Sequence, residues 1–413
     1  TDCVLVSTAS LWRQFALGQD TSRRQFPEWR HDLAWLPDSF GFASGLPAVA
    51  NATGVRWFCT HKLAWNATNA FPHRLFRWRG RGGAELLALM LPGIGTDADP
   101  QAMQQEQMCF QATTGVEQAL WLPGVGDHGG GPTREMLEEM QLWNDHPQAV
   151  PRRAGTVREY LQRLEPFRES LPVWKDELYL ELHRGCATSR PDQKRHNRTL
   201  ERLLREADLL AALGAESAQA NDWPVLLFQQ FHDILPGTSI PEVFDQAESQ
   251  WRVARRRAAR LCKAALHQLL EPASRAESAG EAGCQRWAWC GLQPLQRWSP
   301  MVRLQRGQWS CEGQHLPSQP APGGDLWVQL PEAKGVVALP LECRADAQRI
   351  TGVDPVVRDP VQVQRIAEQS WRLSNDCLSV ELDRRGLIRL QDRQGVDQLS
   401  SPLQLRRYRD HGE

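Results

Sequence analysis

Apolar residues between about 150 and 271 recur every three or four positions, a spacing that is typical of amphipathic helices. The pattern predicts one helix that ends near Gly214, a second from Asp222 to about Asp233, and a long third helix that begins after Ser239. Asp222 is a suitable cap for the second helix. We expect the three helices to bury their apolar stripes against one another in a bundle.

The first 135 residues have a different pattern, in which short apolar runs end in turns rich in glycine and proline. The clearest runs are AWLPDSFGF, LLALMLPGIG and ALWLPGVGDHGGGP. Runs of this length are typical of strands in α/β structure. Because α/β folds bind ligands just past the carboxyl ends of strands, Asp38 and Asp127 become candidate site residues.

Residues 272 to 283 carry no large apolar side chain, which indicates a linker. Beyond it, alternating stretches such as LWVQLPEAKGVVALPLE and WRLSNDCLSVELDRRGLIRLQD predict strands and a hairpin. The chain is therefore expected to be multidomain, of the class α/β + α + β. The expected segments are an α/β domain (1–145), a helical bundle (146–271), a small β domain (284–350) and the start of a β-sandwich (365–413).

The composition, with 41% hydrophobic and 23% charged residues, is that of a folded globular protein. Forty-eight basic and 49 acidic residues leave a net charge of −1, so no overall field attracts nucleic acid or a membrane surface. The longest apolar runs are shorter than the roughly 20 residues that cross a bilayer. Ten cysteines without a CxxC pair favour buried thiols in a reducing compartment, and we expect a cytoplasmic protein.

The motif FQQFHDILPGT places His232 beside Asp233 at a predicted helix end. A neutral imidazole is a common metal ligand, and a neighbouring carboxylate can orient it or bind a sugar hydroxyl. Capping or surface roles would also explain the pair. In WLPDSFG, Asp38 lies between Trp35 and Phe40, and a partly desolvated carboxylate there suits a nucleophile or metal ligand. An Asx-turn after proline is the alternative.

Two further motifs carry carboxylates. In GVGDHGGGPT, the glycines after Asp127 allow close approach of a ligand, but there is no phosphate-loop lysine that would support nucleotide binding, and a flexible turn remains an alternative. In ELYLELHRG, Glu177, Tyr179, Glu181 and His183 alternate and share one face of an extended segment. Two carboxylates there could complete a hydrolytic pair, although a solvent-facing strand explains them equally well.

Taken in order, WLPDSFG, THKLAWN, GVGDHGGGPT, ELYLELHRG and FQQFHDILPGTSI resemble the motifs of glycoside hydrolase family 38, in particular its cytosolic and bacterial α-mannosidases. The resemblance implies a zinc-dependent retaining hydrolase of terminal α-mannosides or manno-oligosaccharides. It also implies a partial α/β barrel-like catalytic domain, of which 1–145 would be the C-terminal part, followed by a three-helix bundle and β-sandwich segments.

The resemblance implies a role for each matching residue. Asp38 would be both nucleophile and zinc ligand, and His232 a second zinc ligand. Asp233 would bind sugar hydroxyls, Phe40 would line the mannose subsite, and Lys62 would be the basic residue near the nucleophile. The general acid is expected to be Asp127, with Glu177 as the reserve candidate and a further substrate-binding residue.

The sequence departs from the family pattern in one respect, because it lacks the N-terminal His-x-Asp motif that supplies the remaining zinc ligands. We therefore expect a chain truncated at both ends, with two ligands, weak metal binding and little activity of its own. The alternative is a non-catalytic mannoside-binding or degenerate homologue. No nucleic acid or membrane partner is expected, and a homo-oligomer remains open.

Overall fold

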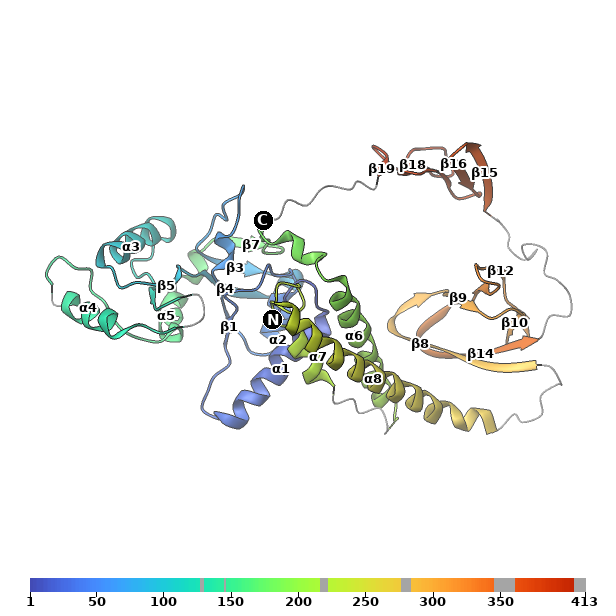
Figure 1. Ribbon diagram of the computed structural model, residues 1–413, viewed down its shortest axis with the longest axis horizontal. Coiled ribbons are helices and arrows are strands. Elements are labelled where there is room, and N and C mark those ends of the chain that lie inside the picture. Colours follow the sequence, from blue (N-terminus) through green and yellow to red (C-terminus); the bar gives the residue numbers. More distant parts are fainter. Residues whose placement is uncertain (127–129, 145, 216–221, 276–283, 345–360, 405–413) are drawn as a thin grey trace. The chain divides into compact units, whose positions relative to one another are not determined.

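The computed structural model describes residues 1–126, 130–144, 146–215, 222–275, 284–344 and 361–404. The chain divides into two compact units, Thr1–Leu269 and Leu270–Gly412 (Figure 1). The finer division at residues 145 and 146, and that between the two β segments, stays a prediction.

In the described part of the first unit, five strands form one mixed open sheet in the order β1-β2-β4-β3-β7. β1, β2 and β4 run parallel to one another, whereas β3 is antiparallel to β4 and parallel to β7. A separate two-stranded pair consists of β5 and β6. The bounds are β1 Leu33–Trp35, β2 Trp57–Thr60, β3 Leu75–Arg79, β4 Glu85–Met90, β5 Ile94–Thr96, β6 Leu122–Pro123 and β7 Val173–Lys175.

The central strands are apolar on both faces because both faces of the sheet are covered. Along β4, Leu86 and Ala88 belong to one core cluster, while Leu87 and Leu89 belong to another. Side chains alternate between the faces of a strand, so the two clusters lie on opposite sides of the sheet. This explains why the run LLALM has no polar alternation.

Helices supply the other half of each cluster. α1 (Thr8–Gln25) and α2 (Leu46–Ala52) contribute Leu11, Leu46 and Ala50 to the first cluster. α3 (Pro100–Thr114) and α5 (Val157–Leu164) contribute Phe110, Leu161 and Leu164 to the second. α4 (Arg134–Asn144) follows β6. The fold is therefore mixed α/β, as expected; closure into a barrel-like domain stays a prediction.

Three helices follow the sheet: α6 (Pro191–Ala212), α7 (Trp223–Gln229) and α8 (Pro241–Arg275). The predicted second helix is too long, because α7 ends at Gln229 and the chain turns through His232 and Asp233. The amides of Phe231, Ile234 and Gly237 bond to carbonyls three residues back, which is typical of turns. α6 and α8 contact through the buried Trp251 indole, which donates to the amide oxygen of Gln193 at 2.8 Å.

The predicted strands of the second unit are present. A four-stranded sheet (β11-β10-β14-β8) and a three-stranded sheet (β12-β13-β9) share one core to which Trp309, Leu341 and Val328 contribute. The later strands β15 to β19 pair in sequence order. The bounds are β8 Cys284–Trp298, β9 Met301–Leu304, β10 Gln308–Cys311, β11 Gln314–His315, β12 Ser318–Pro320, β13 Leu326–Gln329, β14 Ala333–Arg344, β15 Gln362–Ala367, β16 Ser370–Ser374, β17 Ser379–Asp383, β18 Gly386–Gln391 and β19 Leu403–Gln404.

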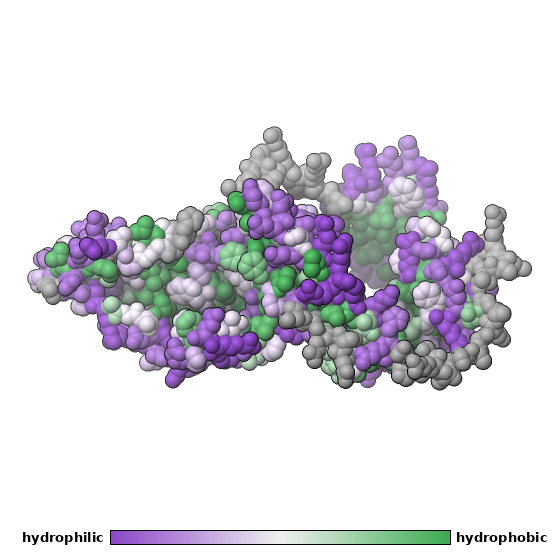
Figure 2. Space-filling view, turned by 60° about the horizontal axis from the view of Figure 1, so that its bottom comes forward, coloured by the Kyte–Doolittle hydropathy of each residue, from purple (hydrophilic) through white to green (hydrophobic). Residues whose placement is uncertain are grey.

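No helix among the described residues combines the length and the apolar character needed to cross a membrane. On the face visible in Figure 2, hydrophilic and hydrophobic residues are interspersed.

The fold predicts a stability role for Glu165. Its carboxylate accepts a 2.6 Å hydrogen bond from the indole of Trp57, which is fully buried, and two further bonds from Arg168. Glu165→Ala leaves the buried indole N–H without its partner, so the free energy of unfolding should fall by about 1–3 kcal/mol in urea titrations. Glu169→Ala is the control, because that 84% exposed carboxylate pairs with Arg77 at the surface and should change little.

The difference in stability between wild type and Glu165→Ala should depend on pH. The hydrogen bond from Arg168, with help from Trp57, holds the pKa of Glu165 below its ordinary value. A lowered folded-state pKa stabilises the fold fully above the ordinary carboxylate pKa of about 4.3, and this stabilisation is lost as pH falls through the lowered value. The stability gap between wild type and Glu165→Ala should therefore narrow in acid; an unchanged gap would contradict the assignment.

Candidate functional site

The parallel pairing of β1 and β2 brings Asp38 next to His61 and Lys62. Both strands end at the same edge of the sheet, and the Thr60 hydroxyl donates to the carbonyl of Pro37 at 3.3 Å. Asp38 Oδ1 lies 3.6 Å from Lys62 Nζ and 3.6 Å from His61 Nε2. The Asp38 side chain is 40% exposed and that of Lys62 only 9%. The site thus has an accessible carboxylate beside a nearly buried ammonium.

The turn PDSFGF directs its two aromatic residues, Phe40 and Phe42, to different places. Phe42 is in the core, and Gly41 before it has a φ of +103°, a backbone conformation that favours glycine. Phe40 lies instead among site residues, with ring centroids 4.7 Å from His183 and 6.3 Å from His232. The structure therefore brings Phe40 and His232 together, although 192 positions separate them in the chain.

Gln230 fixes the turn that carries His232 and Asp233. The fully buried Gln230 amide donates to Asn197, Ser10 and Glu201, at 2.8, 3.1 and 3.2 Å. The backbone carbonyl of Gln230 accepts a hydrogen bond from the backbone N–H of Asp2 at 2.8 Å. This network ties the turn to α6, to α1 and to the first residues of the chain.

His232 is electrostatically linked to the Asp38 side of the site. Burial lowers its pKa, the Asp233 and Asp38 carboxylates counteract that effect, and Lys62 acts in the same direction as burial. The net lowering favours a neutral imidazole at neutral pH, which is the form that binds metals. Asp233 Oδ2 lies 3.6 Å from His232 Nε2, while Oδ1 accepts a hydrogen bond from Thr238 at 2.9 Å.

Glu181 is buried and its carboxylate is fully engaged. The amides of Thr68 and Asn69 donate to it at 2.6 and 2.9 Å, as does the Asn69 side chain. These bonds, that of Thr68 first, hold the pKa of Glu181 below its ordinary value. The interpretation of this segment as a solvent-facing strand is therefore wrong for Glu181. The segment leaves extended structure, and His183 has a left-handed backbone conformation with a φ of 63°.

The two candidates for the general acid are differently placed. The Glu177 side chain is exposed; its carbonyl accepts from the Trp174 indole, and within the described ranges its carboxylate makes no hydrogen bond or ion pair. Asp127 lies outside the described residues, between Gly126 and Gly130. Both assignments stay predictions.

Sequence reasoning on single residues missed His61 and Trp65 as members of this site. Trp65 lies with its ring centroid 3.7 Å from Lys62 Nζ and 5.4 Å from the ring of His183. The available signal was position: HKLAW directly follows the apolar strand β2, just as PDSF follows β1.

Among the described residues, the donor set of this site is smaller than zinc requires. Catalytic zinc sites have three protein ligands. Across the described part of the chain, no group of three or more His, Cys, Asp and Glu side chains is arranged to hold a metal ion. Asp38 and His232 are suitable donors, but these two do not complete a zinc site.

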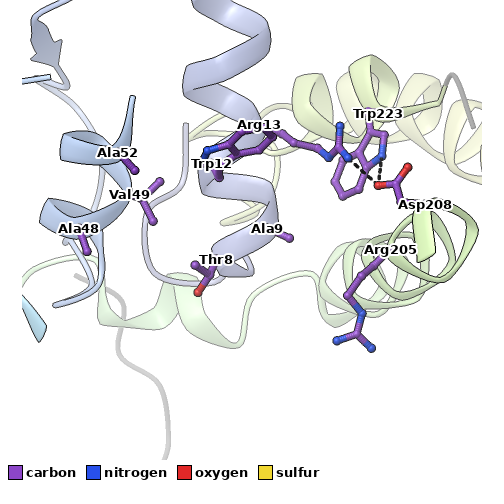
Figure 3. A pocket seen from close by; sticks show the side chains of 10 residues that line it. All are labelled: Thr8, Ala9, Trp12, Arg13, Ala48, Val49, Ala52, Arg205, Asp208 and Trp223. Carbon is purple, nitrogen blue, oxygen red and sulfur yellow. Dashed lines mark hydrogen bonds and ion pairs between the residues drawn. The ribbon is translucent and has the colours of Figure 1, made fainter. Parts of the chain in front are cut away.

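One hollow in the described part of the first unit lies away from the predicted residues. This cleft of about 420 Å³ is bordered by α1, α2, α6 and α7 (Figure 3). Arg13 reaches from α1 to Asp208 at 2.6 Å and stacks on Trp223, whose indole also donates to Asp208. Three of the polar side chains in this cleft, those of Arg13, Asp208 and Trp223, are thus engaged with one another. Its lining residues are Thr8, Ala9, Trp12, Arg13, Ala48, Val49, Ala52, Arg205, Asp208 and Trp223.

Comparison with known families accounts for this arrangement. Residues 1–177 match the N-terminal domain of glycosyl hydrolases family 38, and residues 181–269 match the alpha mannosidase middle domain. The chain therefore belongs to glycoside hydrolase family 38, which confirms the resemblance seen in the motifs.

Named relatives are α-mannosidases. Human alpha-mannosidase 2C1 is 30% identical over 397 residues, which cover 93% of this chain and 35% of that protein. The alpha-mannosidase of Saccharomyces cerevisiae is 36% identical over 265 residues, or 59% of this chain and 24% of the yeast protein. The crystal structure of an α-mannosidase from Enterococcus faecalis V583 has a TM-score of 0.68 at 16% identity, covering 96% of this chain and 51% of that one, and supports the fold alone. The chain spans about a third of the human relative's length.

Gln230 provides a test of how the His232 turn is held. Gln230→Ala removes the donor shared by Asn197 and the buried Glu201, so the free energy of unfolding should fall by about 1–3 kcal/mol in a denaturant titration. Gln246→Ala, on the exposed face of α8, is the matched control and should leave stability within about 0.5 kcal/mol. Equal effects of the two substitutions would show that the buried network does not hold the turn.

Proposed function

We propose that this chain serves in the hydrolysis of terminal α-D-mannosides with retention of configuration. The observation that carries the proposal is the juxtaposition of Asp38 with Lys62, and of Phe40 with His232, in a chain whose named relatives are α-mannosidases. An α-mannoside or manno-oligosaccharide is the substrate class.

Asp38 is proposed as the nucleophile. In a retaining mechanism its carboxylate attacks the anomeric carbon and forms a covalent glycosyl-enzyme, which water then hydrolyses. The exposure of its side chain supports access, and the Lys62 ammonium lies 3.6 Å from its Oδ1. We propose that Asp233 and Lys62 bind sugar hydroxyls, Asp233 through Oδ2, the oxygen that does not accept from Thr238. Phe40 is proposed to line the mannose subsite.

Asp127 is proposed as the general acid that protonates the leaving oxygen and then acts as base, with Glu177 in reserve. The acid of a retaining enzyme should lie about 5–5.5 Å from the nucleophile. Glu177 has an exposed side chain. Asp127 is preferred because the glycines that follow it in the sequence allow a ligand to approach closely.

Zinc remains part of the proposal for Asp38 and His232, with the condition that a third ligand joins them. No step of the reaction above depends on it. The limited donor set also supports the second candidate, a non-catalytic mannoside-binding homologue. A cytoplasmic location is proposed because Cys3, Cys59, Cys262, Cys311 and Cys343 are buried thiols.

The substrate class can be tested by ligand binding. The 413-residue chain should bind methyl α-D-mannoside more tightly than methyl α-D-glucoside in saturation-transfer NMR, and Asp233→Ala should weaken mannoside binding by about tenfold, the scale of one hydrogen bond to a charged group. Asp245→Ala, exposed on α8, is the control. Equal binding of the two sugars would contradict the proposal.

The nucleophile can be tested independently of the general acid. A fluorinated mannosyl fluoride has a leaving group that needs little protonation, so it should label the peptide containing Asp38, and Asp38→Asn should abolish the label by mass spectrometry. Turnover of an aryl α-mannoside should remain far below the usual kcat of about 10 s⁻¹. Ordinary turnover that a chelator abolishes would overturn the two-ligand argument; mannoside binding without labelling would favour the non-catalytic candidate.

The donor count predicts weak metal binding. After dialysis against metal-free buffer the chain should retain well under one zinc per molecule by elemental analysis, because two protein ligands hold zinc poorly. Retention of one zinc that is lost in both Asp38→Asn and His232→Ala would show that a third ligand is present in the chain.

A further inference from the structure

We propose that Trp65 is a positioning residue that holds the Lys62 ammonium against Asp38, and that Glu181 fixes Trp65 in this place. One consequence of this inference, that the Lys62 ammonium is presented to a sugar hydroxyl, rests on the proposed function. The geometry that supports the inference is independent of that function.

The first step concerns what holds Lys62. Its Nζ lies 3.6 Å from Asp38 Oδ1, which is longer than the 2.7–3.2 Å of an ordinary N–H···O hydrogen bond. The nearest face is that of Trp65, at 3.7 Å from the ring centroid, and the ring of Phe40 follows at 5.8 Å. A cation over an indole is the strongest form of this contact, and it is worth more when the ammonium is desolvated, as in this 9% exposed side chain.

The second step concerns what holds Trp65. Its ring contacts His183, and its carbonyl accepts from the amide of Leu182 at 3.3 Å. Next to it, the Glu181 carboxylate binds the amides of Thr68 and Asn69, while the Glu181 amide donates to Asn66 Oδ1 at 2.8 Å. These reciprocal bonds join two segments more than 110 residues apart. Glu181 is thus not available as a hydrolytic carboxylate; it fixes the loop that carries Trp65.

The consequence lies in the donors of Lys62. Among the described residues no hydrogen-bond acceptor is found for the Lys62 ammonium, which faces the rings of Trp65 and Phe40 and lies 3.6 Å from Asp38 Oδ1. Its N–H groups can therefore donate to a hydroxyl of a sugar bound at Asp38. Loss of Trp65 should release the lysine into solvent and scatter these donors.

The test is competitive labelling with an amine-reactive reagent, read by peptide mass spectrometry at one pH. The chain has five lysines, so Lys62 can be compared with the exposed Lys175 in each sample. Trp65→Leu should raise the Lys62 labelling rate relative to Lys175 about fivefold, as expected when a cation–π contact is lost. Trp65→Phe keeps a π face and should stay within about twofold of wild type.

Matched controls separate positioning from general loosening. Trp29→Leu removes another exposed tryptophan, one that stacks on Phe26 away from Asp38, and should leave Lys62 unchanged. Glu181→Gln should raise Lys62 labelling as Trp65→Leu does, with no further rise in the double variant, whereas Glu169→Gln should have no effect. An unchanged Lys62 in Trp65→Leu, or an equal rise of all five lysines, would overturn the proposal.

A binding arm distinguishes this inference from the proposed function. If the chain binds methyl α-D-mannoside, Trp65→Leu should weaken binding about tenfold and Trp29→Leu should not. Failure of the wild-type chain to bind mannoside would count against the function, while the labelling of Lys62 would still decide whether Trp65 holds it. Mannoside binding that Trp65→Leu leaves unchanged would refute the role of the positioned cation.

Discussion

The parallel pairing of β1 with β2 is the constraint on which the site depends. It places the segments after the two strands at one edge of the sheet, so that Asp38 meets His61 and Lys62. The pairing is itself secured by burial, because every residue of β2 is buried and successive side chains enter clusters on opposite faces. A change of register by one residue would exchange those faces, so the core determines the position of the charged groups as well.

The other half of the site depends on buried polar bonds rather than on apolar packing alone. Gln230 links the His232 turn to α1 and α6, and Glu181 links the Trp65 loop to the segment before His183. Buried polar groups that lose a partner are costly, whereas satisfied ones select a single arrangement. Both residues therefore contribute specificity of position to a site whose reactive groups lie on turns.

The family assignment and the incomplete donor set are compatible. Two family matches cover residues 1–177 and 181–269, yet the chain spans 35% of its human relative. Membership thus concerns the shared fold and motifs, while the function of the chain remains a proposal. In the proposed site, Lys62, Phe40 and Asp233 would bind sugar hydroxyls and a ring face without a metal, so the proposal treats mannoside binding and mannoside hydrolysis as separable properties.

The sequence by itself determined the helices α6 and α8, the strands of the β segments and the family motifs, because these follow from local periodicity and turn residues. It also singled out Asp38 and His232. Only the tertiary structure decided that α7 stops before His232, that Glu181 is a buried hydrogen-bond acceptor, and that Trp65 covers Lys62. Such outcomes depend on partners more than 100 residues away in the case of Glu181, and on side-chain direction in the case of Trp65. Local pattern contains neither, since the free energy of a buried polar group is set by the neighbours that the complete fold supplies.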